Sequence, residues 1–182
     1  MKSAVEAGLR RDGANCGVEM FDRGVLFVGA GPYELGLLAE AVALDYIRAS
    51  ARYAPIRFYA ATLDEPVGID PLLLRALKKL ELDASGLSQK PMALYSMIGA
   101  PQIDHVVSVG RVVPKSTLTE LLGTVDCRVW AFGKELAAAA PPGTRYAHYL
   151  ERAHDIKAQL PMFAEELADL GALSANQVAA TA

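Results

Sequence analysis

The sequence predicts a single α/β domain in which helices cover both faces of a parallel sheet. Segments with the character of strands alternate with segments with the character of helices, which is typical of βαβ units. The chain has 182 residues, and 52% of them are hydrophobic. This composition supports one core of ordinary size and leaves little room for a second domain.

The first half of the chain carries two predicted strands, each followed by a helix. GVLFVG at residues 24–29 is a continuous apolar run, as expected of a strand buried on both faces. Apolar residues at helical spacing predict a long helix over residues 33–53. PIRFYAAT at residues 55–62 is the second strand. After it, Asp70 and Pro71 are expected to be the N-cap and first residue of the next helix.

The second half of the chain repeats the alternation after a segment rich in glycine and proline at residues 84–101, which is expected to be mainly loop. A third strand is predicted at residues 102–110, a short helix at 115–123 and a fourth strand at 126–133. A long last helix is expected at residues 144–170. We therefore expect the chain to divide into an N-terminal extension at residues 1–22, a folded domain at residues 23–170 and a flexible tail at residues 171–182.

Charge and hydropathy exclude several classes of partner. The formal net charge is −3, and the basic residues do not cluster as they do in proteins that bind nucleic acid or anionic membranes. The first residues contain no apolar signal core, and no stretch is long and apolar enough to span a membrane. We therefore expect a cytoplasmic protein with no nucleic-acid partner and no membrane partner.

No pattern in the sequence indicates a metal or a cofactor. The two cysteines, Cys16 and Cys127, form no disulfide framework or zinc motif and are expected to be free thiols. Glu151 and His154 have the E-x-x-H spacing of di-iron bundles, but such sites need a second motif, which is missing here. A charge-paired helix face accounts for this pair better than a metal site does.

The turn GAGPYELG, residues 29–36, carries the main functional question. Gly29 and Gly31 fit the first two positions of the dinucleotide-binding pattern G-x-G-x-x-G, but Glu34 stands where the third glycine is needed. Gly36 comes two residues too late. A dinucleotide-binding protein is therefore the weakest of the alternatives.

A wider pattern carries a more specific resemblance. VLFVGAGPYELGLLAEA resembles the first strand, phosphate loop and first helix of the low molecular weight protein tyrosine phosphatases and the thioredoxin-coupled arsenate reductases. FYAATLDEPVGIDPLLLRALKKL and IDHVVSVG are similar to the second strand and helix and the third strand of that family, so that the likeness covers residues 24–110. The resemblance implies a three-layer, flavodoxin-like fold with a four-stranded parallel sheet of order 2-1-3-4.

The same resemblance implies that the catalytic groups have been replaced. The family's loop is C-x5-R-[ST]; here Gly29 stands in place of the cysteine nucleophile, Leu35 in place of the arginine and Gly36 in place of the hydroxyl residue. The family's general acid is an aspartate in the loop after the fourth strand, where this chain offers only Glu135. The sequence thus predicts a protein without phosphatase or arsenate reductase machinery.

Glu34 and Pro32 also weaken the turn as an anion site. Amides at a helix N-terminus bind anions, but Pro32 has no amide proton and Glu34 adds a negative charge. A neutral or cationic small ligand, or a turn with a structural role only, fits better. The candidate ligand-binding residues are Gly29, Ala30, Gly31, Pro32, Tyr33 and Glu34.

The functional hypothesis is a non-catalytic, phosphatase-like protein that acts as a binding or regulatory module. Its expected partners are another protein, a second copy of the chain or a small molecule, with no cofactor and no metal. One alternative is an enzyme with different chemistry in the same pocket, where Tyr33 and Glu34 would be the acid and base groups. Residual phosphatase or arsenate reductase activity is the other.

Overall fold

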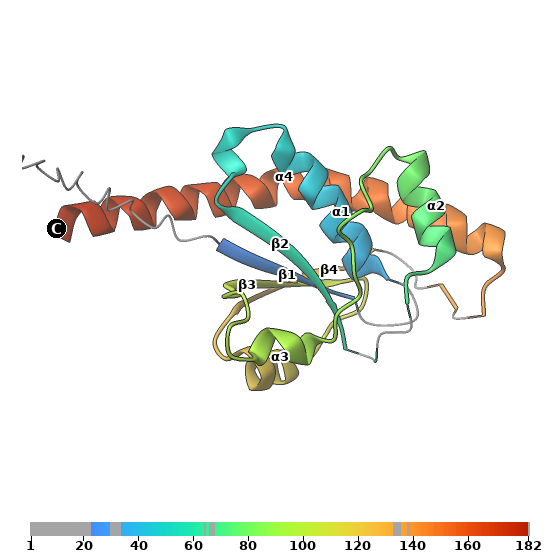
Figure 1. The fold of residues 1–182 in the computed structure, drawn as a ribbon, viewed down its shortest axis with the longest axis horizontal. Coiled ribbons are helices and arrows are strands. Elements are labelled where there is room, and N and C mark those ends of the chain that lie inside the picture. The colour runs from blue at the N-terminus through green and yellow to red at the C-terminus, as the bar shows by residue number, and fades with distance from the viewer. Residues whose placement is uncertain are drawn as a thin grey trace, which may run out of the picture.

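The computed structural model describes residues 23–29, 34–63, 65, 68–132, 136–137 and 139–181, with side chains up to Leu170 except that of Arg23. Its centre is a parallel sheet of four strands in the order β2-β1-β3-β4 (Figure 1). The strands are β1 (Arg23–Gly29), β2 (Ile56–Thr62), β3 (His105–Val109) and β4 (Asp126–Trp130). The predicted fold class and strand order are confirmed.

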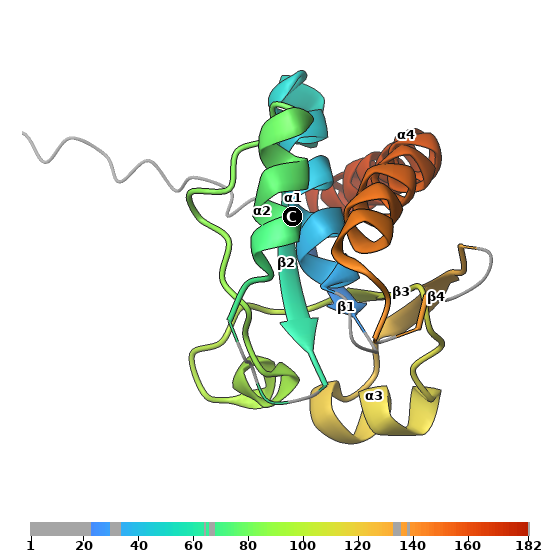
Figure 2. The same cartoon turned by 90° about the vertical axis from the view of Figure 1, so that its right-hand side faces the viewer.

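Helices form a layer on each face of the sheet (Figure 2). One layer consists of α1 (Leu35–Arg48), α2 (Pro71–Lys79) and α4 (Pro142–Thr181). The other consists of α3 (Lys115–Leu122) and the 3-10 turn η2 (Met92–Ser96). The first layer is therefore much the larger of the two.

The central position of strand β1 in the sheet explains why its sequence is apolar throughout. Val25 and Phe27 pack into the core beneath α1, α2 and α4, whereas Leu26 and Val28 pack into the core beneath α3 and η2. All four side chains are fully buried. Because successive residues of a strand point to opposite faces, a central strand covered on both faces needs apolar residues at every position.

Helix α1 is shorter than predicted. The sequence pattern predicted one helix over residues 33–53, but α1 ends at Arg48 and a separate 3-10 turn, η1, covers Ala51–Tyr53. Ser50 separates them, because its Oγ accepts a hydrogen bond from the amide of Arg52, 3.3 Å away. A serine that bonds to the backbone in this way favours a new helical start over continuation of the old helix.

Helix α4 is longer than predicted at both ends. Its backbone is helical from Pro142 to Thr181, whereas the prediction was residues 144–170, so no helix end marks the proposed start of a tail at residue 171. Pro161 lies within it on the exposed side, where a missing amide is tolerated best. The sequence after residue 170 contains several alanines, which favour a helix, but also Gly171 and Asn176, which do not. None of the helices described here is long and apolar enough to cross a membrane.

Candidate functional site

The turn after β1 begins with a close contact between two glycines. A Cβ atom on Gly29 would lie 3.1 Å from the amide nitrogen of Gly36. A Cβ atom on Gly36 would lie 2.9 Å from the amide nitrogen of Gly29 and 3.0 Å from the carbonyl oxygen of Phe27. The distance at Gly36 is one that real Cβ atoms essentially never show, and the distance at Gly29 would require the backbone to shift by a few tenths of an ångström. The close approach of the first turn of α1 to the end of β1 therefore favours glycine at both positions.

Leu35, between these glycines and α1, is part of the core. Its side chain is buried, and its Cδ1 atom lies 2.9 Å from where a Cβ atom of Gly110 would be. Gly110 has a φ of 86°, a conformation that glycine adopts readily and other residues rarely do. Position 35 therefore supports packing between α1 and the end of β3.

Glu34 occupies the N-cap position of α1, but its side chain does not cap that helix. Its Oε2 atom accepts a hydrogen bond from the backbone amide of Asp70, 2.8 Å away. Asp70 is the N-cap residue of α2, so the carboxylate of Glu34 reaches across to the positive end of a second helix. Glu34 thus joins the starts of α1 and α2.

The surroundings of Glu34 raise its pKa. Partial burial is the largest cause of the raised pKa, and the negative charge of the Asp70 carboxylate adds to the increase. The hydrogen bond from the Asp70 amide and the positive charge of Arg145 both lower the pKa and offset part of the increase. Burial disfavours the charged form of a carboxyl group, and a neighbouring negative charge does the same. Glu34 therefore holds a proton more readily than an ordinary glutamate does.

Asp70 is surrounded by donors. Its Oδ1 atom accepts the amide of Leu72 at 2.9 Å, as an N-cap should, which confirms the prediction for this residue. Its Oδ2 atom accepts the Tyr149 hydroxyl at 3.0 Å and the Arg145 guanidinium. Partial burial opposes ionisation, but the bonds from Leu72, Arg145 and Tyr149 together lower the pKa of Asp70. Two side chains of α4 thus hydrogen-bond to the N-cap residue of α2.

A small polar cavity lies beside this network, at the edge where β1 and β2 end. It has a volume of about 20 Å³, room for about one water molecule. Its lining includes both glycines of the turn and polar groups from three segments, namely Gly29, Gly36, Glu34, Thr62, Gln89 and Lys90. The amide of Thr62 donates to the carbonyl oxygen of Lys90 at 2.9 Å, which holds the residue 90 segment against the end of β2.

Glu40 is a second unusual carboxyl group near this cavity. Burial raises its pKa to about 7, although the positive charge of Lys90 acts against the shift. Burial and the charge of Glu40 in turn raise the pKa of Tyr95 to about 12, and the Tyr95 hydroxyl donates to the carbonyl oxygen of Ala60 at 3.1 Å. Glu40 was not among the residues predicted for the site, although it is an acidic residue among the buried apolar residues of α1.

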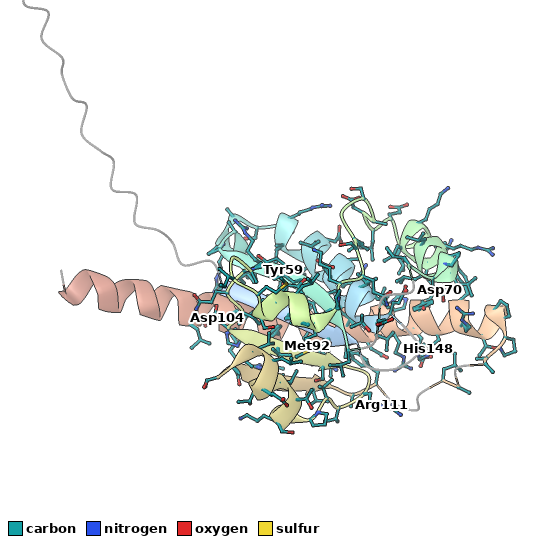
Figure 3. The ribbon with its side chains drawn as sticks, turned by 60° about the horizontal axis from the view of Figure 1, so that its bottom comes forward. Tyr59, Asp70, Met92, Asp104, Arg111 and His148 are labelled. Carbon is teal, nitrogen blue, oxygen red and sulfur yellow. The ribbon has the colours of Figure 1, made fainter. Side chains whose placement is uncertain are left out.

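Two of the six predicted ligand-binding residues can be placed. Gly29 and Glu34 both line the cavity, whereas residues 30–33 lie outside the described part of the chain. Sequence reasoning placed Asp70 only as a helix cap and missed Arg145 and Tyr149, because their roles depend on α4 packing beside α2. Asp70, at the start of α2, and His148, in α4, lie toward the same end of the molecule (Figure 3).

No described cluster of three or more His, Cys, Asp or Glu side chains is arranged to hold a metal ion. Glu151 and His154 are both exposed, and Glu151 pairs with Arg152. Arg152 itself is buried and also donates to the carbonyl oxygen of Phe132 at 2.6 Å. The two residues of the E-x-x-H pair thus lie on the outside of α4, with one of them in an ion pair.

Comparison with known proteins identifies the fold. No family model matches the chain, and no curated protein matches it. A low molecular weight protein tyrosine phosphatase from T. tengcongensis matches 79% of this chain and 99% of its own, with a TM-score of 0.57 and 19% identity. The chain has the fold of that phosphatase.

Two further solved structures agree with this assignment. A protein tyrosine phosphatase from Entamoeba histolytica covers 79% of this chain and 97% of its own, with a TM-score of 0.55 and 14% identity. An arsenate reductase from Archaeoglobus fulgidus covers 75% of this chain and 98% of its own, with a TM-score of 0.51 and 16% identity. At such identities the likeness extends to the fold and not to the chemistry, so function has to be argued from the residues.

Proposed function

We propose that this chain is a non-catalytic protein with a phosphatase-like fold that acts as a binding or regulatory module. The observation that carries the proposal is the contact between Gly29 and Gly36. If the resemblance in sequence holds residue by residue, these are the positions of the nucleophile and of the hydroxyl group that supports it. A Cβ atom on Gly29 would lie 3.1 Å from the amide nitrogen of Gly36, and one on Gly36 would lie 2.9 Å from that of Gly29, which leaves little room for those two side chains.

The side chain of Leu35, which stands where the family's loop has its arginine, supports the same proposal. Leu35 is buried in the core between α1 and β3 instead of facing the turn. The guanidinium group of Arg145, which belongs to the network around Asp70, is already paired with that carboxylate. A phosphoryl group is normally gripped by an arginine that presents two donors to its oxygens, and Arg145 is committed to a carboxylate of the chain itself.

Charge also argues against a phosphate ligand. The Glu34 carboxylate takes the amide of Asp70 that an anion at the start of α2 would use. Two unit charges about 4 Å apart at an effective dielectric of about 20 repel by roughly 4 kcal/mol. A neutral or cationic ligand, or a protein surface, suits the site better, and we propose that the module functions in the cytoplasm through such contacts.

One observation favours a different function for the same site. The pKa of Glu34 is raised and that of its neighbour Asp70 is lowered. A pair of carboxyl groups whose pKa values are driven apart is a recurring arrangement for general acid and base catalysis. An enzyme with new chemistry at Glu34 is therefore the second candidate.

The first test is an activity assay with two reactions. The purified chain, given an aryl phosphate or given arsenate with thioredoxin, should show no turnover above a buffer blank, while an active low molecular weight phosphatase provides the positive control. Turnover that disappears in Glu34→Ala would contradict the proposal and favour catalysis at Glu34.

A second test asks what the protein binds. Native mass spectrometry of protein purified from its own host should show a bound protein, a second copy or a small molecule. Titration with inorganic phosphate should show no binding, and Glu34→Gln should bind phosphate more strongly than the unmodified chain. A monomer that carries no partner or ligand and binds phosphate tightly would contradict the proposal of a binding module.

A further inference from the structure

Strand β4 is an outer strand of the sheet, with α4 on one of its faces and α3 on the other (Figure 2). Where β4 pairs with β3, the amide of Asp126 donates to the carbonyl oxygen of Asp104 at 3.0 Å, so the backbone groups of Asp126 point toward β3. Alternate residues of a strand direct their backbone groups to opposite sides. Cys127 and Val129 therefore direct their amides and carbonyl oxygens away from β3, toward the outer side of β4.

These outward groups have no partner in the part of the chain that the structure describes. No hydrogen bond from outside the sheet reaches the backbone of Cys127 or Val129 from those residues. The other outer strand differs, because the amide of Thr62 at the end of β2 donates to the carbonyl oxygen of Lys90 at 2.9 Å. Donors and acceptors on the outer side of a strand pair readily with a further strand. The outer side of β4 is therefore a place where a strand can be added.

Exposed apolar side chains lie on both faces beside this strand. Cys127 packs against the core beneath α3, and Val129, two residues further on, shares that face and is 44% exposed. On the other face, Met162 of α4 is 76% exposed. It lies one turn before Glu166, whose carboxylate pairs with Arg128 of β4. A strand added at β4 would bring apolar surface close to both side chains, and removing them from water is favourable.

The charges of β4 indicate which strand fits. Asp126 and Arg128 both face α4, and they flank Cys127 at equal distances along the strand. Asp126 Oδ2 lies 3.2 Å from His105 Nδ1. In an antiparallel pair of two β4 strands centred on Cys127, Asp126 of each strand lies directly opposite Arg128 of the other. Opposite charges at such positions stabilise a pair of strands, whereas like charges destabilise it. Moving the centre to Asp126 or to Arg128 would place like charges opposite each other.

We propose that a second copy of the chain adds to β4 in antiparallel orientation, centred on Cys127, so that the two sheets join into one. In this register each Cys127 donates its amide to the carbonyl oxygen of the other, as in a hydrogen-bonded pair. Val129 then lies opposite Val125 of the other copy. The matching order of charges favours a second copy over a strand of unrelated sequence. The interface uses none of the residues around the turn after β1, so it goes beyond the proposed function and does not depend on it.

Sedimentation equilibrium of the full chain at several concentrations tests the dimer. The unmodified chain should show a reversible equilibrium between monomer and dimer. Val129→Lys should raise the dissociation constant about tenfold or more, since a lysine on an outer strand opposes pairing. Leu74→Lys is the matched control, because Leu74 is 40% exposed on α2, and it should leave the constant unchanged. A monomer at every concentration, or equal effects of the two lysine variants, would overturn the proposal.

Thiol cross-linking tests the register. In Cys16→Ser, an ethylene-bridged bis(methanethiosulfonate) should join two chains at Cys127, since the Cα atoms of a hydrogen-bonded pair are about 5.5 Å apart. In Cys16→Ser/Cys127→Ser/Val129→Cys, the two thiols at position 129 would be four residues apart along the strands, or about 14 Å. The yield of covalent dimer should therefore fall several-fold. An equal or higher yield from position 129 would overturn the register centred on Cys127.

Discussion

The edge of the sheet where the strands end carries polar side chains that bond to one another, whereas the edge where the strands begin carries exposed apolar side chains. At the edge where the strands end, Glu34, Arg145 and Tyr149 all hydrogen-bond to Asp70 and so join α1, α2 and α4. At the edge where they begin, apolar side chains around Met97 are left exposed. In Figure 3, Asp70 lies toward the first edge and Asp104 toward the second.

This difference indicates that the polar groups at the first edge are bonded within the chain, whereas the apolar groups at the second edge would be stabilised by contact with another surface. A polar network whose hydrogen bonds are made within the chain stabilises the fold, and its Asp70 and Arg145 are already paired with each other instead of with a phosphate. Exposed apolar side chains such as Met97 lower the free energy only when something removes them from water. Substitutions at the first edge should therefore act mainly on stability, and those at the second mainly on contacts.

The largest effect is expected for Asp70→Ala. The change removes the α2 cap and takes the acceptor away from both Arg145 and Tyr149, so we expect a loss of about 3 kcal/mol in the free energy of unfolding. Urea denaturation measures it. Asp83→Ala is the control, since Asp83 also accepts an amide and an arginine but is exposed, and its effect should be much smaller. Similar losses in both variants would show that the Asp70 network adds little.

Gly36→Ala should be next. The new methyl group would clash with the backbone of Gly29 and Phe27, and overpacking of this kind destabilises by about 2 kcal/mol. Gly86→Ala is the matched control, because nothing lies within 4 Å of a Cβ atom there. If thermal unfolding shows no difference between the two variants, the close glycine contact is not a constraint, and the main support for a non-catalytic site is lost.

Glu40→Gln should make stability less dependent on pH. Its folded pKa of about 7 lies above the ordinary 4.5, so the folded state binds the proton more tightly. The contribution of Glu40 is most favourable below pH 4.5 and is lost as the pH rises to about 7. The variant should therefore be more stable than the unmodified chain by about 1–2 kcal/mol at pH 8, with little difference at pH 4.

Glu120→Gln, on the exposed surface of α3, controls for the loss of one negative charge. Chemical denaturation at the two pH values distinguishes the variants. A gain at pH 8 that is equal for positions 40 and 120 would trace the effect to net charge and not to the burial of Glu40.

The smallest effect on stability is expected for Met97→Ser. Because Met97 is 61% exposed, the loss should stay below about 0.5 kcal/mol. Leu118→Ala, in the fully buried part of α3, should instead lose about 3 kcal/mol. A large loss for Met97→Ser would mean that Met97 is already part of the core, which would remove the contrast between the two edges.

Much of the fold could be predicted from local patterns. The apolar run of β1, the Asp70–Pro71 helix start and the alternation of strands with helices depend on nearby residues, and all three are confirmed. The errors lie at ends of elements. Ser50 stopped α1 early through a bond to the amide of Arg52, and such a bond competes with the helix in a way that periodicity does not reveal.

The candidate site was predictable only in part. Gly29 and Glu34 could be identified from the turn GAGPYELG because they follow a buried strand and precede a helix. The partner of Glu34 could not, since the amide of Asp70 is distant in sequence and reaches the site through the packing of α2 against α1 and α4. Hydrogen bonds across elements depend on where the helices dock.

The sequence by itself determined the layer architecture and the position of the turn after β1, because strand and helix periodicities and short connections restrict the topology. The strand order was implied by the resemblance to the phosphatase family. Only the tertiary structure decided that the Gly29 and Gly36 backbones touch, that Glu34 bonds to the start of α2 and that Leu35 faces the core. The physical reason is distance: these contacts join groups brought together by packing, and their free energies depend on separations of a few tenths of an ångström.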